Sequence, residues 1–151
     1  AAFAAWLERE TADDAEAALW FQARFGQGWA RENQGRYEEA MRDYARVVEQ
    51  HEGPTAARAQ FQIGQCLFAM GRHEDAAREL IRVDILYAYP EWSAAALYEA
   101  GRCFMAMGRT AEAREQFEAV RQRFADTSWA NLAAQRLAGA SPARTPGRSQ
   151  N

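Results

Sequence analysis

One six-residue pattern occurs three times in this chain: Gly35-Arg36-Tyr37-Glu38-Glu39-Ala40, then Gly71-Arg72-His73-Glu74-Asp75-Ala76, then Gly108-Arg109-Thr110-Ala111-Glu112-Ala113. The copies follow one another after 36 and 37 residues. A further glycine lies seven residues before each copy, at Gly28, Gly64 and Gly101, and an aromatic residue lies three residues earlier still, at Phe25, Phe61 and Tyr98. Matches at this many positions in three copies indicate an internal repeat, which is typical of a solenoid.

Each repeated position has a physical role in a pair of helices. The glycine that opens the pattern suits a turn with positive φ, after a first helix that we call helix A. The alanine that ends the pattern allows close crossing, and the apolar residues four and seven positions later lie on one face of a second helix, helix B. The glycine inside helix A costs about 1 kcal/mol of helix stability. We therefore expect a neighbouring backbone to approach closely at that glycine.

These patterns predict an all-α chain, an antiparallel helix-pair solenoid with about three full repeats. A hydrophobic content of 48% and a scarcity of β-branched residues favour helix over strand. The three units are expected at about residues 14–52 (unit one), 54–90 (unit two) and 91–126 (unit three).

Both ends of the predicted helical domain, residues 1–138, depart from the repeat. Residues 1–10 are expected to form a helix B whose helix A is missing, as if the chain were cut from a longer array. Residues 128–138 are predicted to form a polar capping helix, with its N-cap within Asp126-Thr127-Ser128. Residues 139–151 have lost the periodicity and are predicted to be a disordered tail.

The unit resembles the tetratricopeptide repeat over about residues 14–126. The resemblance implies a right-handed superhelix whose A helices line a concave groove, and it implies which positions of helix A face that groove. Carried onto this sequence, those positions are Phe25, Trp29, Glu32, Phe61, Gln65, Phe68, Tyr98, Arg102 and Met105. Such an aromatic groove suits a helix or peptide of another protein. The alternative that the same side chains only fill the stack stays open.

Unit one departs from the pattern in its helix A. Arg24, Gln27 and Arg31 stand where the other units carry mostly apolar residues. We expect this helix to be rotated or to pack less deeply against its missing neighbour.

The repeats are longer than the usual tetratricopeptide unit of about 34 residues, and the extra residues fall in the links between units. With the link Tyr89-Pro90-Glu91-Trp92-Ser93, this period is similar to bacterial cell-envelope members of the family, the periplasmic Tol-Pal coordinating protein and the outer-membrane assembly lipoproteins. The resemblance favours the bacterial periplasm or cell envelope over the cytoplasm.

Composition and spacing argue against several other functions. A net charge of -3 without a basic stripe argues against a nucleic-acid partner. The longest apolar run is far below the roughly 18 residues of a membrane span. His51 and His73 lack ligand partners at metal-site spacing, and no phosphate-binding loop is present. We therefore expect no metal, no cofactor and no enzymatic activity.

The two cysteines, Cys66 and Cys103, occupy equivalent positions on neighbouring A helices. Packed helices are about 9–10 Å apart, and a disulfide needs α-carbons within about 7 Å. The two residues are therefore predicted to be free, buried thiols.

Three functions remain in view. The leading hypothesis is a protein-interaction scaffold that binds a protein or peptide partner in the concave groove. The first alternative is self-assembly, in which residues 1–10 or the groove join copies into a homo-oligomer. The second is an accessory domain of a larger protein whose activity lies outside this chain.

Overall fold

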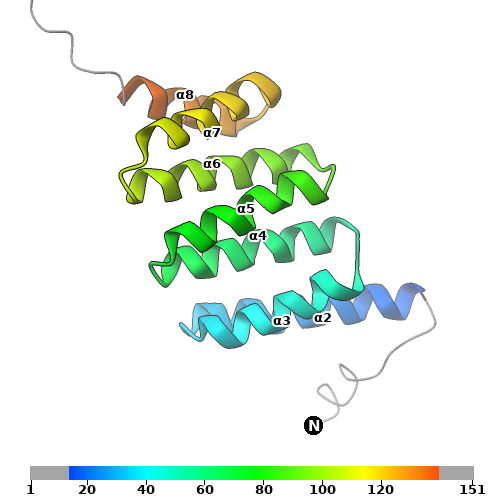
Figure 1. Ribbon diagram of the computed structural model, residues 1–151. Helices are drawn as coiled ribbons and strands as arrows, with labels where there is room; N and C mark the ends of the chain where they lie inside the picture. Colours follow the sequence, from blue (N-terminus) through cyan, green and yellow to red (C-terminus); the bar gives the residue numbers. More distant parts are fainter. Residues whose placement is uncertain (1–13, 140–151) are drawn as a thin grey trace, which may run out of the picture.

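The computed structural model describes residues 14–139, and every element in this range is a helix. The helices are α2 (Asp14–Asn33), α3 (Tyr37–Gln50), α4 (Pro54–Ala69), α5 (His73–Leu86), α6 (Pro90–Ala106), α7 (Thr110–Arg123) and α8 (Ser128–Gly139). They stack pair upon pair from α2 and α3 at one end to α8 at the other (Figure 1). The prediction of an all-α helix-pair solenoid is confirmed.

The turn between helix A and helix B has the same conformation in all three units. Gly35, Gly71 and Gly108 have φ angles of 74°, 76° and 73°, as predicted. The amide of the residue that follows each glycine closes the turn by donating to a carbonyl of helix A; for example, Arg36 N donates to Arg31 O at 2.9 Å. Glycine is needed here because a Cβ is disfavoured at positive φ.

An arginine follows each of these glycines and pairs with an acidic residue three positions later. Arg72 Nη2 lies 2.7 Å from Asp75 Oδ2, and Arg36 and Arg109 make the equivalent pairs with Glu39 and Glu112. The hydrogen bond from Arg36 holds the pKa of Glu39 below its usual value. The acidic residue also lies in the first turn of helix B, where the helix dipole favours negative charge.

The glycine inside each helix A faces a large side chain of helix B, and not a backbone. A Cβ on Gly28, Gly64 or Gly101 would lie 2.8, 2.4 or 2.5 Å from the side chains of Tyr44, Leu80 and Phe117, respectively. The expectation of a close backbone was therefore wrong. Helix A lacks a side chain here because the buried side chain of helix B fills that space.

Successive pairs pack so that the A helices come closest together. The backbones of α2, α4, α6 and α8 approach one another in turn, whereas those of α3, α5 and α7 do not. A stack whose elements are closer on one side curves toward that side. The A helices therefore line the concave face and the B helices the convex face.

The apolar core runs the length of the stack. One buried cluster centres on α2 and α3, and a larger one extends from α4 to α8. Met41 and Ile63 pack against both clusters and join them. Each unit thus buries its apolar side against the next, as expected of a repeat array.

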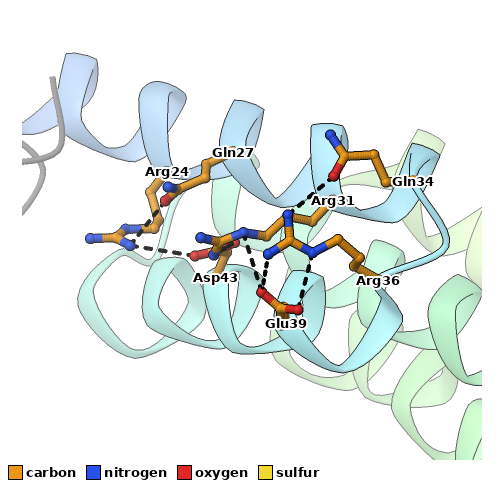
Figure 2. A network of polar contacts seen from close by, with 7 residues as sticks. All are labelled: Arg24, Gln27, Arg31, Gln34, Arg36, Glu39 and Asp43. Carbon is orange, nitrogen blue, oxygen red and sulfur yellow. Dashed lines mark hydrogen bonds and ion pairs between the residues drawn. The ribbon is translucent and has the colours of Figure 1, made fainter. Parts of the chain in front are cut away.

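Arg24, Gln27 and Arg31 of α2 form a polar network around Asp43 of α3, and α2 is not rotated. Arg31 Nη1 lies 2.5 Å and Arg24 Nη1 3.4 Å from the carboxylate of Asp43, and Arg24 also donates to Gln27 (Figure 2). Gly28 keeps its place against the ring of Tyr44, so α2 has the same register as α4 and α6. The expected rotation was wrong, because Asp43, only 3% exposed, neutralises the arginines within the usual register. The alternative, looser packing against the missing neighbour, concerns residues outside the described range.

The positions of Arg24 and Asp43 carry less polar residues in the later units. In unit two the equivalents are Gln60 and Glu79, whose side chains form a hydrogen bond of 2.6 Å. In unit three they are Leu97 and Gln116. The contact between helix A and helix B at these positions is thus a buried ion pair in unit one and an amide–carboxylate hydrogen bond in unit two. In unit three Leu97 replaces the polar residue of helix A.

The observed helix bounds differ slightly from the predicted units. Pro90 begins α6, although it was placed in unit two, and Gly139 is the last residue of α8, although it was placed in the tail. Thr127 precedes α8 and donates its hydroxyl to Phe124 O at 2.7 Å. The predicted helix over 1–10 and the remaining tail, 140–151, lie outside the described residues.

Replacing Gly101 with Ala is expected to destabilise the fold by about 1–3 kcal/mol, because the new methyl group overpacks against the buried ring of Phe117. Gly26→Ala is the matched control, since nothing lies within 4 Å of its Cβ position in the same kind of helix. That change is expected to stabilise by about 1 kcal/mol. Urea denaturation followed by circular dichroism measures both, and equal midpoints would contradict the packing account.

Asp43→Ala is expected to lower the free energy of unfolding by about 3–5 kcal/mol, because it leaves two arginines without their buried partner. Glu118→Ala removes the surface pair with Arg121 and is expected to cost less than about 1 kcal/mol. Thermal and urea unfolding of the two variants give the comparison. Similar losses in both would show that the network contributes no more than a surface ion pair.

Candidate functional site

Three of the predicted groove residues are buried in the seams between A helices. Phe25, Phe61 and Tyr98 are 6%, 8% and 6% exposed. A side chain of the next helix A covers each ring: Arg58 lies 4.2 Å above Phe25, Trp92 is 5.6 Å from Phe61, and Trp129 is 5.4 Å from Tyr98. At these three positions the aromatic side chains fill the stack, which is the alternative that the sequence left open.

Five of the other predicted groove residues are accessible. Trp29 is 44% exposed and Met105 is 40% exposed. Gln65, Phe68 and Arg102 are half-buried. These five residues come from α2, α4 and α6, the A helices that approach one another on the concave side of the stack. A partner on this face would meet these side chains, with the buried rings behind them.

Three arginines each reach from one helix A to an aromatic ring of the preceding helix A. The Cζ of Arg58 lies 5.8 Å from the ring of Trp29, that of Arg102 lies 5.1 Å from Phe68, and that of Arg136 lies 6.0 Å from Tyr98. Arg136 also donates from Nε to the hydroxyl of Tyr98 at 3.1 Å. Cation–π contacts of this kind orient a guanidinium and leave N–H groups for further hydrogen bonds.

Sequence reasoning missed Arg58 and Arg136. Neither arginine recurs at the same position of the other units: the equivalent of Arg58 is Ala95 in unit three. A search by repeat position passes over them, because it finds what the copies share. Their role depends on the ring of a neighbouring unit, which the spacing along one helix does not reveal.

The arginines on this face differ in their ion pairs. Arg102 is paired with Glu99 at 2.9 Å, whereas Arg58 makes no ion pair with any residue in the described range. Glu99 is itself buried, and burial raises its pKa against the opposing effect of Arg102. The concave face therefore offers arginines and apolar rings to solvent, with Glu99 withdrawn beneath them.

Glu32, another predicted groove residue, is turned toward the interior. Its carboxylate accepts hydrogen bonds from the hydroxyl of Tyr44 at 2.7 Å and from the side-chain amide of Gln62 at 2.9 Å. It thereby ties α2 to α3 and to α4. Burial, and then the Glu32 carboxylate, raise the pKa of Tyr44. Glu32 thus acts in the joint between units one and two.

The two cysteines are free and buried, as predicted. Burial is the main cause that raises the pKa of each thiol to about 12, with further contributions from Glu32 at Cys66 and from Glu99 at Cys103. At neutral pH both groups are therefore protonated. A protonated, buried thiol is a poor nucleophile.

The histidines make aromatic contacts. His51 stacks on Phe21 with ring centroids 4.2 Å apart, and His73 meets the edge of Phe68 at 5.0 Å. Within residues 14–139, no three His, Cys, Asp or Glu residues are grouped so that they could hold a metal ion. Every helix in the same range is too short or too polar to cross a bilayer.

Comparison with solved structures finds similar helix-pair stacks. A type III secretion translocator chaperone of Yersinia enterocolitica, SycD, matches with a TM-score of 0.62 and 17% identity, over 81% of this chain and 87% of that one. PcrH, solved with the chaperone binding region of PopB, matches with a TM-score of 0.65 and 17% identity, over 87% and 98%. At such identities the likeness shows the fold.

A third structure extends the likeness beyond secretion chaperones. A putative kinesin light chain of Podosopora anserina, with nearly identical TPR-like repeats, matches with a TM-score of 0.69 and 20% identity, over 91% of this chain and 72% of that one. No curated protein matches the sequence.

Family models match the sequence directly. One model described as a tetratricopeptide repeat matches residues 25–90, and a second with the same description matches residues 95–127. Together the two matches cover more than half of the chain and include residues of all three units. The chain belongs to the tetratricopeptide repeat family.

Proposed function

We propose that this chain is a protein-binding scaffold that holds a segment of another protein along its concave face. The observation that supports this proposal best is the row of cation–π contacts from Arg58 to Arg136, which follows the A helices. Trp29 and Met105 add exposed apolar area to the same face. Tryptophan and arginine are the residue types most enriched at binding hot spots.

The chemistry of this face indicates the chemistry of the partner. Arg58 has no carboxylate partner among the described residues, and Arg102 pairs there with the buried Glu99 alone. A segment that alternates acidic and apolar side chains would supply the missing carboxylates and cover Trp29, Phe68 and Met105. Arginine donates two parallel hydrogen bonds to a carboxylate, which fixes the register of such a segment.

Rigidity makes the face suitable for this task. Each arginine already rests on a ring of the neighbouring helix. The rings of Phe68 and Tyr98 are in turn packed against His73 and Trp129. Little side-chain entropy is then lost when a partner binds. The partner could be a helix or an extended strand, because the face follows four helices rather than one narrow pocket.

The solved relatives are consistent with this proposal by analogy of fold. PcrH was solved with the chaperone binding region of PopB, and SycD is described as a translocator chaperone. A stack of this size can therefore hold a segment of another protein. We also keep the bacterial cell envelope as the proposed location, on the length of the repeat and the link from Tyr89 to Ser93. A signal sequence or its absence in the complete gene product would test it.

Trp29→Ala combined with Arg58→Ala is expected to raise the Kd for peptide partners about tenfold or more, because the pair removes an exposed ring and an unpaired guanidinium from one spot. Peptides selected from a phage-displayed random library on the unaltered chain serve as probes. Their affinity is measured by fluorescence anisotropy. The selected peptides are expected to be rich in Asp and Glu next to apolar residues.

Arg78→Ala is the matched control, because Arg78 is an exposed arginine on α5, on the convex side. It should leave peptide affinity unchanged, and circular dichroism should show equal helicity in all variants. Phe61 is unsuitable for this test, since truncation of its buried ring is expected to cost about 3–5 kcal/mol of stability. Equal affinity in the double variant and the unaltered chain would exclude the concave face.

A further inference from the structure

The convex surface of unit two carries apolar side chains that the repeat does not require. Ile85 is 72% exposed and Leu86 is 54% exposed, at the end of α5. Glu49 and Gln122 occupy the position of Ile85 in units one and three, and Gln50 and Arg123 occupy that of Leu86. The other two copies thus act as internal controls. They show that a polar residue satisfies the fold at both positions.

Ile81 extends this apolar surface one turn back along α5. Its equivalents are Ala45 and Glu118, and it is half-buried against the core. We call Ile81, Ile85 and Leu86 the convex ridge. Three larger apolar side chains at positions that are small or polar in both other units indicate a local function.

Hollows lie on both sides of the ridge. One, of about 300 Å³, opens between α5 and α7, with Ala77, Ile81, Ile85 and Phe104 among its lining residues. The other, of about 410 Å³, is lined by Ile85, Leu86, Tyr87, Pro90 and Phe124, among others. The first hollow exists because the backbones of the B helices do not approach one another. Ile85 lines both hollows and stands between them.

The charges around these hollows are paired within the chain. Arg123 meets Asp84 at 2.8 Å, Arg82 meets Glu79 at 3.5 Å and Arg78 meets Asp75 at 3.3 Å. Arg109 pairs with Glu112 and lies 3.9 Å from Glu74. The surface is therefore close to neutral. It has no excess charge to select an acidic or a basic partner, and none to repel an identical surface.

We infer that the convex ridge joins two copies of this chain about a twofold axis. In a twofold interface the same patch lies on both sides, so the patch must contain a protrusion together with a hollow that receives it. The ridge and its flanking hollows meet that requirement, and the internally paired charges allow two such surfaces to face each other. The concave face is left open in this arrangement. A dimer would present two concave faces and bind multivalent partners more tightly than a single copy.

Sedimentation equilibrium of the chain over a concentration series tests this inference. The average mass should rise toward twice the monomer mass as concentration increases. Ile85→Glu should weaken association about tenfold or more, because it places a charge on each side of the axis. Gln122→Glu places the same charge at the equivalent position of α7 and should leave association unchanged.

A second variant tests the geometry. The native thiols are buried, so Leu86→Cys adds an accessible cysteine next to the proposed axis. Under mild oxidation it should form a disulfide-linked dimer, whereas Gln122→Cys should not. Ile85 is largely exposed, so Ile85→Glu should retain helicity and should bind the selected peptides as a monomer, which separates this inference from the proposed function.

Two results would overturn the inference. One is an unaltered chain that stays monomeric at every concentration. The other is a dimer that Ile85→Glu leaves as tight as before, since such a dimer would use a different surface.

Discussion

The contact between the glycine of each helix A and a large residue of helix B sets the spacing on which the whole stack depends. Gly28, Gly64 and Gly101 meet Tyr44, Leu80 and Phe117, each of which is almost completely buried. A side chain on helix A would collide with these residues, so the helices would separate. The helix pair is then held close enough for its remaining apolar side to pack on the next pair. If the two helices of a pair were farther apart, their surface would no longer match that of the next pair, and the packing of the neighbouring units would be disturbed as well.

Curvature follows from this spacing and produces two different surfaces. The A helices approach one another closely, so aromatic rings fill their seams and arginines lie across them. The B helices are farther apart, and hollows remain between them. A single structural property thus gives the chain a compact concave face crossed by arginines and a convex face with apolar recesses. The two proposals concern these two faces and do not compete for the same residues.

The units share a frame but differ in how their helices are joined. Unit one uses the buried carboxylate of Asp43 to neutralise Arg24 and Arg31, whereas unit three has Leu97 in place of the first arginine. A buried ion pair is sensitive to the loss of one partner, and apolar packing is more tolerant. The comparison of copies within one chain also separates what the fold needs from what it does not. By that criterion the repeat fold does not require apolar residues at Ile85 and Leu86.

Periodicity along the chain was enough to predict the helices, their turns and the positive φ of Gly35, Gly71 and Gly108, because these depend on residues close in sequence. The burial of the cysteines was predicted for the same reason. The accessibility of the groove was not, since the exposure of Phe61 and Tyr98 depends on Trp92 and Trp129, which belong to the following helix. Asp43 and Arg58 were likewise missed. Their partners lie on another helix, and only the packed stack brings such residues within reach of one another.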